Sequence, residues 1–214
     1  MLPQQQITSI NINLLYLLIN ITVLSLLVNH MLRCMIKNDY SRWIDCLFMG
    51  GSLSIIFLFQ NTTIPFVLVL FWGLFALSLM DIFYRVLPNV INFILLILGL
   101  VLNVQNQFIS ITCSIRGILA AYAILWIVSW NYKYLTGCSG IGKGDLKLAA
   151  ALGAWIGLEG VLPLLFWSSL LGCGFYGFMA VKGEYNRMSR IPFGVFLSVV
   201  GMSIFVMRFS LWRL

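Results

Sequence analysis

Charged residues are scarce in this chain. Only 9% of its 214 residues are charged, and just six are acidic, whereas an ordinary soluble domain carries about 25% charged residues. With 61% apolar residues and a mean hydropathy of +1.00, the chain cannot cover a globular surface with polar groups. The composition therefore excludes a soluble domain and favours a protein embedded in a lipid bilayer. The length allows one compact membrane domain, residues 1–214, without a second, soluble one.

The sequence also lacks the patterns of metal, disulfide and nucleic-acid binding. It has a single histidine, His30, and five cysteines, no two of which are spaced C-x-x-C. Neither a zinc signature nor a disulfide framework is present. The net charge is +7, but the basic residues lie in short, scattered clusters with no dense tract. We therefore expect no bound metal and no nucleic-acid partner, and we interpret the basic residues as determinants of membrane orientation.

Hydropathy predicts an all-α, polytopic membrane helix bundle of about eight transmembrane helices. The first apolar run has no basic region before it and no A-x-A-like site after it, so we expect a retained helix and not a cleaved signal peptide. Residues 1–45 are predicted to form this span and a short loop, and residues 46–214 the main bundle. The second and sixth spans are the weakest, since an upright helix needs about 20 residues. The predicted spans are residues 12–32, 46–60, 64–80, 89–104, 110–130, 146–158, 161–181 and 192–209.

The distribution of basic residues predicts the orientation of this bundle. If all eight spans cross and the N-terminus is outside, ten of the thirteen basic residues fall in inner loops, and the opposite orientation reverses this ratio. We therefore expect both termini outside. Asp81 and Asp145 then lie at the cytoplasmic boundary at the same depth, so two residues far apart in sequence can meet in space.

These two acidic residues stand at the ends of apolar segments. Asp145 follows a glycine-rich turn at residues 140–144 and opens an alanine-rich segment, and Asp81 lies 64 residues earlier. An ionisable group against lipid is expensive, and its default interpretation is functional. Glycine permits a tight turn that presents Asp145 toward Asp81. The sequence therefore predicts a carboxylate pair that shares one proton and activates a water molecule.

Each of these residues also has a structural interpretation. Asp145 could be a helix cap, since Asp is a preferred N-cap residue, and Asp81 could pair with Arg85 if that stretch is helical. We favour membrane anchoring as the role of Lys143 and Lys147. All three basic side chains are expected to point away from the carboxylate pair, because they would otherwise favour ionisation of both acids.

A stripe of small residues follows Asp145. Ala149, Gly153 and Gly157 recur every four residues, so they share one face of the predicted helix. Such stripes let membrane helices pack closely. We expect this packing, and no chemical role, from the stripe, because a fixed helix holds a catalytic carboxylate in place.

Taken together, these motifs resemble the type IV prepilin peptidases, a family of membrane aspartic proteases with a G-x-G-D motif. The similarity includes that motif, the run GDLKLAAALGAWIG, the first aspartate with its downstream Leu-Pro-Asn, and a late Pro-Phe-Gly signature. The matching landmarks fall between about residues 78 and 197. The residues that carry the resemblance are Asp81, Pro88, Asn89, Gly142, Gly144, Asp145, Lys147, Pro192, Phe193 and Gly194.

The resemblance implies an activity, a partner and a location. Family members cut the short basic leader from prepilins and pseudopilins at the cytoplasmic face of the bacterial inner membrane, which agrees with the orientation predicted from charge. By the family motif, Asp81 and Asp145 are the catalytic pair, and the peptidase chemistry needs no cofactor. The substrate arrives as a membrane-anchored helix, so recognition requires a groove open to lipid. Asn89, Asn92 and Glu184 could line its wet end, although each is also explained as an ordinary interfacial residue.

One departure from the family pattern concerns methylation. Bifunctional relatives carry a cytoplasmic insert with paired C-x-x-C motifs, and they methylate the new N-terminus with S-adenosylmethionine. Here the loop at residues 33–45 is short, with only Cys34 and Cys46 near its ends. We therefore expect no zinc-bound element and doubt the methyltransferase activity. S-adenosylmethionine is a cofactor only if methylation is retained.

Three other functions remain open at this point. A presenilin-like intramembrane protease would carry a late Pro-Ala-Leu motif, and here only Pro192-Phe193-Gly194 is found. A proton-coupled transporter predicts ionisable residues near mid-membrane and repeat symmetry, and both are missing. A non-catalytic subunit of a pilus or secretion assembly predicts that Asp145→Asn is tolerated.

Overall fold

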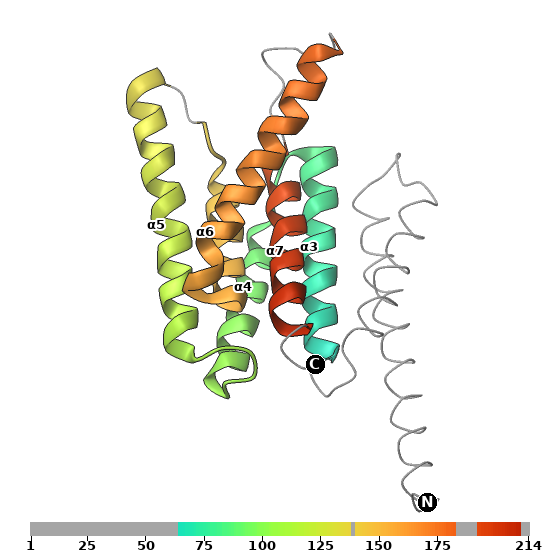
Figure 1. Cartoon of the computed structure of the whole chain (residues 1–214), viewed down its shortest axis with the longest axis vertical. Coiled ribbons are helices and arrows are strands. Elements are labelled where there is room, and N and C mark those ends of the chain that lie inside the picture. Colours follow the sequence, from blue (N-terminus) through green and yellow to red (C-terminus); the bar gives the residue numbers. More distant parts are fainter. Residues whose placement is uncertain (1–63, 138–139, 183–191, 211–214) are drawn as a thin grey trace, which may run out of the picture. The chain divides into compact units, whose positions relative to one another are not determined.

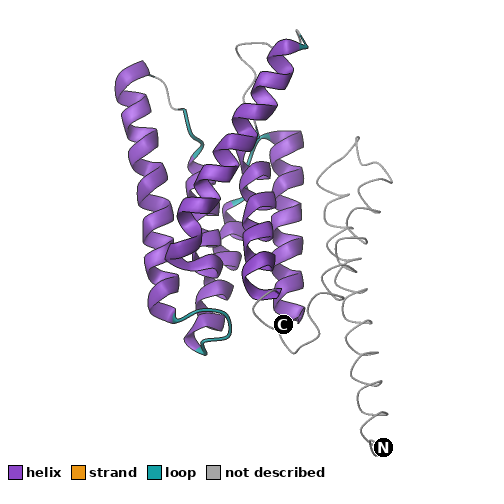
Figure 2. Ribbon diagram, in the orientation of Figure 1, coloured by secondary structure: helices purple, strands orange, loops and turns teal. Residues whose placement is uncertain are grey.

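The structure, a computed structural model, describes residues 64–137, 140–182 and 192–210. These residues are helical apart from short turns (Figures 1 and 2). The predicted spans 12–32 and 46–60, the loop between them, His30 and Glu184 lie outside the described residues. The helices of the described part are α3 (Ile64–Tyr84), α4 (Asn89–Val104), α5 (Ile111–Thr136), α6 (Lys143–Val181) and α7 (Phe193–Ser210).

The chain divides into two compact units, Met1–Trp72 and Gly73–Leu214. Only the beginning of α3 is described in the first unit. The second unit contains the rest of α3 and helices α4 to α7, and α6 contacts α4, α5 and α7 within it. Every described residue of the candidate site belongs to this second unit. The predicted single domain over residues 1–214 stays a prediction.

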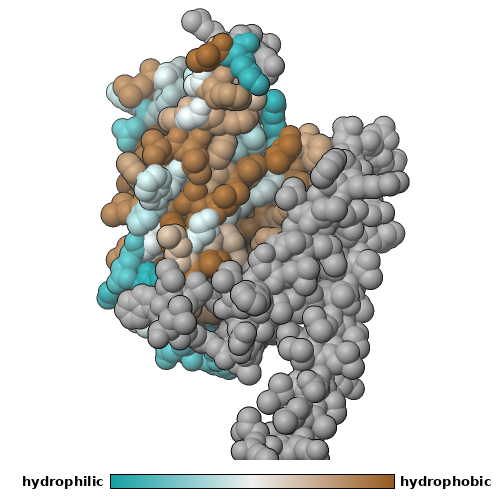
Figure 3. Space-filling view, turned by 45° about the vertical axis from the view of Figure 1, so that its right-hand side comes forward, coloured by the Kyte–Doolittle hydropathy of each residue, from teal (hydrophilic) through white to brown (hydrophobic). Residues whose placement is uncertain are grey.

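Apolar surface identifies the described part as a membrane helix bundle. Three helices, Phe66–Tyr84, Ile111–Thr136 and Lys143–Val181, are long and apolar enough to cross a bilayer, and α4 and α7 are shorter apolar helices. In the part of Figure 3 that is coloured, hydrophobic residues cover much of the surface. Large apolar side chains of α5, such as Leu119, Trp126 and Trp130, are exposed. Exposure of such an apolar surface is unfavourable in water and favourable against lipid acyl chains.

Helix α6 reverses its direction at one glycine. Gly157 has φ 70° and ψ 179°, which interrupts the helical backbone inside α6. A positive φ of this size suits glycine, because it has no β-carbon. The ribbon folds back here, so residues 143–156 form a first arm and residues 158–181 a second arm (Figure 1). The predicted break between the sixth and seventh spans therefore lies at Gly157, at the end of the sixth.

Side chains from two other helices satisfy the backbone at this reversal. The last carbonyl groups of a helix have no intrahelical partner, and none can stay unpaired in lipid. The Ala154 carbonyl accepts hydrogen bonds from Asn103 Nδ2 and Ser114 Oγ, both at 2.8 Å. Asn103 Oδ1 in turn accepts from the Ile109 N–H at 3.1 Å. Asn103 therefore ties the end of the first arm to the turn between α4 and α5.

Arg208 of α7 supplies a further contact at the same end. Its Nη1 donates to the Ile156 carbonyl at 3.0 Å, and its Nη2 pairs with the Glu159 carboxylate. A cation at a helix C-terminus is also favoured by the helix dipole. The interaction stabilises both sides of the reversal, one residue before Gly157 and two residues after it.

The first arm of α6 is the core of this unit. Its Trp155 is completely buried, lies 5.8 Å from the rings of Phe108 and Phe205, and donates from Nε1 to the Leu95 carbonyl at 2.9 Å. Because the indole N–H is paired, this large residue is buried without an unsatisfied donor. The arm that carries Asp145 is thereby held in a fixed position.

The small-residue stripe makes the contact between α5 and α6, as predicted. A β-carbon on Gly153 would lie 2.5 Å from the Gly117 carbonyl oxygen, and one on Gly117 would lie 2.4 Å from that of Gly153. The same β-carbon on Gly117 would lie 2.8 Å from the carbonyl carbon of Gly157. Ala149, the third residue of the stripe, is fully buried. The two helices touch backbone to backbone, which only glycine allows.

Candidate active site

The ends of four helices meet around Leu87, in the turn between α3 and α4. A β-carbon on Gly144, at the start of α6, would lie 2.8 Å from Leu87 Cβ, and one on Gly194, at the start of α7, would lie 3.1 Å from Leu87 Cδ1. Pro88, at φ −59° and ψ 126°, is the N-cap of α4. Proline fixes this φ and helps α4 to begin directly after the turn. Helices α3, α4, α6 and α7 therefore have an end at the same place.

Asp81 lies in the last turn of α3 and faces the start of α7. Its side chain is buried, and a β-carbon on Gly194 would lie 2.8 Å from Asp81 Oδ2. The N–H groups of Gly194 and Val195 point toward the carboxylate and favour its charge. Oδ2 nevertheless has no partner with proper hydrogen-bond geometry in the described part of the chain. A buried carboxylate oxygen without a partner is unusual, and it is available to a ligand.

Asp145 lies in the first turn of α6. The N-cap of α6 is Gly142, so the interpretation of Asp145 as the N-cap residue is wrong. Its carboxylate reaches back and accepts from the Gly142 N–H, and a β-carbon on Gly142 would lie 2.9 Å from Asp145 Oδ2. This is the role of the acidic residue in a capping box. The half-buried carboxylate is thereby oriented by the glycine turn that precedes it.

The structure brings these two carboxylates together. Asp81 and Asp145 are close enough for their charges to interact directly. They come from the end of α3 and the start of α6, and the contacts of Leu87 with Gly144 and Gly194 hold these ends in place. Two acids whose charges interact, each beside a helix N-terminus, form an arrangement that can hold one proton between them.

The basic residues near the pair form no salt bridge with it in the described part of the chain. Helix α3 ends at Tyr84, and Arg85 takes a left-handed conformation at φ 54°. The Asp81–Arg85 ion pair, which the sequence left open as a structural alternative, is not formed among the described residues, although the charge of Arg85 still attracts Asp81. Lys147 donates to Asn89 Oδ1 at 2.7 Å, across to α4. This orientation of Lys147, away from the carboxylates, confirms the expectation from the sequence.

The late signature determines how α7 begins. Pro192 directly precedes α7, Phe193 is its first residue, and Gly194 is buried against Asp81 and Leu87. Proline suits the start of a helix, where its missing N–H leaves no bond unmade. Glycine follows because a larger residue would collide with the carboxylate.

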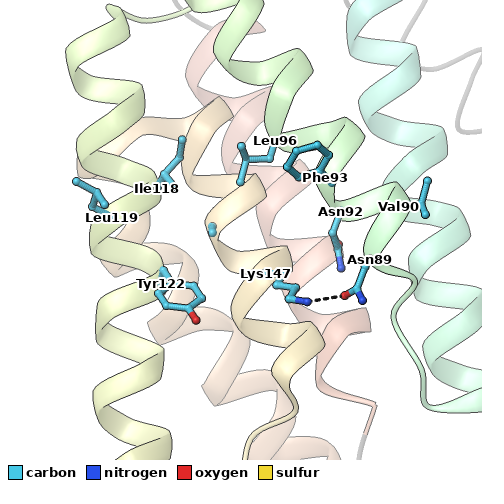
Figure 4. Close-up of a pocket in the computed structure, with 10 residues that line it drawn as sticks. Asn89, Val90, Asn92, Phe93, Leu96, Ile118, Leu119, Tyr122 and Lys147 are labelled. Carbon is cyan, nitrogen blue, oxygen red and sulfur yellow. Dashed lines mark hydrogen bonds between the residues drawn. The ribbon is translucent and has the colours of Figure 1, made fainter.

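A groove lies between α4, α5 and the first arm of α6, and Asn89 and Asn92, which the sequence offered as possible lining residues of a groove, both line it. It has a volume of about 540 Å³ and is drawn in Figure 4. Asn92, weighed both as a groove residue and as an interfacial residue, is 2% exposed, and neither its Nδ2 nor its Oδ1 has a partner in the described part of the chain. The sequence signal for its burial was its position four residues after Pro88, on the face of α4 that also carries Leu95. The residues that line this α4/α5 groove are Asn89, Val90, Asn92, Phe93, Leu96, Ile118, Leu119, Tyr122, Lys147 and Ala150.

The fold and the site define a helical membrane protein with a carboxylate pair at one end of its bundle. The model of the type IV leader peptidase family matches residues 68–177, and the chain belongs to that family. Comparison with solved structures gives no match.

Curated relatives carry the name prepilin leader peptidase/N-methyltransferase. The Xanthomonas campestris protein is 38% identical over 138 residues, which are 64% of this chain and 48% of that protein. The Pseudomonas aeruginosa protein is 41% identical over 135 residues, 63% of this chain and 46% of that protein. The Dichelobacter nodosus protein is 34% identical over 170 residues, 78% of this chain and 58% of that protein. The chain thus spans about half the length of the curated relatives it matches.

Proposed function

We propose that this chain is a membrane aspartic endopeptidase that removes the basic leader peptide of type IV prepilins or pseudopilins. The observation that carries the proposal is the meeting of Asp81 and Asp145, with Asp81 Oδ2 buried and unpartnered. Membership of the leader peptidase family and the names of the curated relatives support the same reaction and substrate class.

The chemistry follows from a pair that holds one proton. The ionised carboxylate takes a proton from a water molecule as the water oxygen attacks the scissile carbonyl carbon. The protonated carboxyl hydrogen-bonds the carbonyl oxygen, and a proton is then delivered to the leaving amine as the C–N bond breaks. Acid–base catalysis of this kind contributes roughly 10²–10⁴-fold to the rate. The substrate backbone satisfies the oxygen of Asp81 that has no partner in this structure.

We further propose that the protein spans the bacterial inner membrane eight times with both termini outside, and that the pair faces the cytoplasm. The turn after α3 and the start of α6 meet at one end of the described unit, and both carry basic residues, among them Arg85 and Lys143. Basic residues favour the cytoplasmic side of a membrane. A prepilin, anchored by its own apolar helix, reaches the pair from within the bilayer.

Methylation is a separate question. The relatives are named as methyltransferases as well as peptidases, and the sequence of this chain contains no C-x-x-C pair. We propose a peptidase without N-methylation, which needs no cofactor. Incubation with labelled S-adenosylmethionine and a cleaved prepilin tests this, and transfer of label to the new N-terminus contradicts it.

The first prediction concerns cleavage by the full chain in liposomes that contain a prepilin. The wild type cleaves at the edge of the substrate's apolar helix, and Asp81→Asn or Asp145→Asn lowers kcat/KM at least about 100-fold, because a carboxamide neither accepts nor donates the proton. The readout is the electrophoretic shift of the substrate.

Glu159→Gln is the matched control. It also neutralises one carboxylate, but Glu159 lies beyond the far end of the first arm, which ends roughly 17 Å along the helix from Asp145. We expect cleavage by this variant. A well-folded wild type that leaves the prepilin intact, or an active Asp145→Asn, would favour a non-catalytic assembly subunit.

A further inference from the structure

The α4/α5 groove lies on a different side of α6 from the carboxylate pair. Consecutive residues of a helix point about 100° apart, so Lys147 points about 200° away from Asp145, two residues before it. Lys147 and Ala150 of α6 line the groove, whereas neither carboxylate does. The groove is therefore a second feature of the molecule and not a part of the proposed peptidase site.

Polar and apolar groups are separated along the groove. In Figure 4 the side chains of Lys147, Asn89 and Tyr122 lie toward one end, and Leu96, Ile118 and Leu119 lie toward the other. No acidic residue is among the described residues that line it. The groove thus has an apolar body and one cationic end.

The polar end has unused hydrogen-bond donors. The Lys147 ammonium carries three N–H groups, and the structure shows one of them donating to Asn89 Oδ1. The amide of Asn92, which is 98% removed from solvent, lines the same groove with neither polar atom paired among the described residues. Leaving such a group unpaired costs about 1–3 kcal/mol, so a ligand with acceptor oxygens at this end would be favoured.

The geometry points to an anionic phospholipid as the occupant, with one acyl chain along the apolar wall and the phosphate at Lys147 and Asn92. The volume of about 540 Å³ is within the range of roughly 300–1,000 Å³ found for small-ligand sites. Leu119 and Tyr122 of α5 are exposed to the bilayer, so a lipid chain enters from the side. A basic leader peptide is repelled by Lys147, which argues against the substrate as the occupant.

Spin-labelled lipids in vesicles test this inference without any peptidase assay. The full chain is reconstituted in phosphatidylcholine vesicles, and the immobilised fraction of acyl-chain-labelled phosphatidylglycerol is compared with that of labelled phosphatidylcholine. The wild type prefers phosphatidylglycerol, and Lys147→Gln lowers this preference about fivefold, the factor expected for one basic residue near a membrane surface. Lys147→Arg, which keeps the charge, retains the preference.

Lys133→Gln is the matched control, since Lys133 is an exposed basic residue in the last turn of α5 that does not line the groove. It retains the preference. Leu119→Trp, which narrows the groove, lowers the immobilised fraction of labelled phosphatidylglycerol. An equal preference of the wild type for both lipids, or an equal loss in the Lys133 and Lys147 variants, overturns the inference. Displacement of the labelled lipid by a prepilin would assign the groove to the substrate and overturn it as well.

Discussion

At the scale of single residues, the candidate site depends on two glycines, because neither has a β-carbon. A methyl group added to Gly142 or Gly194 would lie only 2.9 Å or 2.8 Å from a carboxylate oxygen, too close for either site to accept it without a shift. Their N–H groups face Asp145 and Asp81, respectively. Because these glycines have no β-carbon, the carboxylates can lie this close to the backbone. The glycines therefore determine where the two acids can lie.

The second prediction is that Gly194→Ala impairs the site. The new methyl group would lie 2.8 Å from Asp81 Oδ2 and 3.1 Å from Leu87, so the carboxylate or α7 must shift. We expect a stability loss of about 1–3 kcal/mol, as for an overpacked core, and a fall in prepilin cleavage. Both are measured on the purified variant, by denaturant unfolding in detergent and by the cleavage assay.

Gly174→Ala in the second arm of α6 is its control, because nothing lies within 4 Å of the added methyl group. Alanine raises helix propensity by about 1 kcal/mol there, so the variant is at least as stable as the wild type. If the two alanine variants cleave equally well, close contact between Gly194 and Asp81 is not needed for activity.

At the scale of helices, the reversal of α6 decides which residues meet. The first arm carries Asp145 at its start and is enclosed by α4, α5 and α7, whereas much of the second arm is exposed to lipid. The buried arm ends where Asn103, Ser114 and Arg208 donate to its last carbonyl groups. A backbone that is not helical is tolerated at membrane depth only where protein groups satisfy it.

The third prediction compares two side chains at this reversal. Asn103→Ala removes a donor to the Ala154 carbonyl and the acceptor of the Ile109 N–H, and we expect a loss of about 1–3 kcal/mol. Ser114→Ala removes only one of two donors to Ala154, and its effect is closer to about 1 kcal/mol. The measurement is the free energy of unfolding in detergent. Ser203→Ala, which removes an exposed bond within α7, serves as the control, and an equal effect of all three variants contradicts the role of Asn103.

At the scale of the whole molecule, the described bundle places its polar groups at two opposite ends. The turn after α3 and the starts of α6 and α7 form one end, with the carboxylate pair. The turn between α4 and α5 and the reversal of α6 form the other, as the bonds of Asn103 show. Between these ends, exposed side chains are largely apolar (Figure 3). A bilayer that surrounds this band leaves the carboxylates at its edge, where a water molecule can reach them.

The fourth prediction tests this arrangement by thiol labelling. In a background in which the native cysteines are replaced, Val86→Cys in the turn after α3 reacts with a membrane-impermeant maleimide only from the cytoplasmic side. Gln105→Cys at the end of α4 reacts only from the outside, because both positions are exposed and α4 separates them. Labelling of both positions from one side would show that α4 does not cross, and the opposite sidedness would reverse the proposed orientation.

Several features could be predicted from the sequence because they are local. Hydropathy located α4 at residues 89–104, as observed. It placed the end of α3 four residues, and the end of α5 six residues, before the observed ends. It also identified a break close to Gly157. Scarcity of charge made Asp81 and Asp145 conspicuous. The alternative Asp81–Arg85 pair required a helix through residue 85, whereas α3 ends at Tyr84, before the turn at Pro88.

The sequence by itself thus determined the environment of the protein, the course of its described helices and the identity of its two acids, because each depends on composition or on neighbours along the chain. Only the tertiary structure decided that Gly194 lies against Asp81, that Lys147 points to Asn89, and that a groove with a cationic end opens beside α5. These contacts join residues far apart in the chain, 58 positions for Lys147 and Asn89. Helical periodicity tells which side chains share a face, but the packing of backbones at Gly117 and Gly153 determines which faces meet.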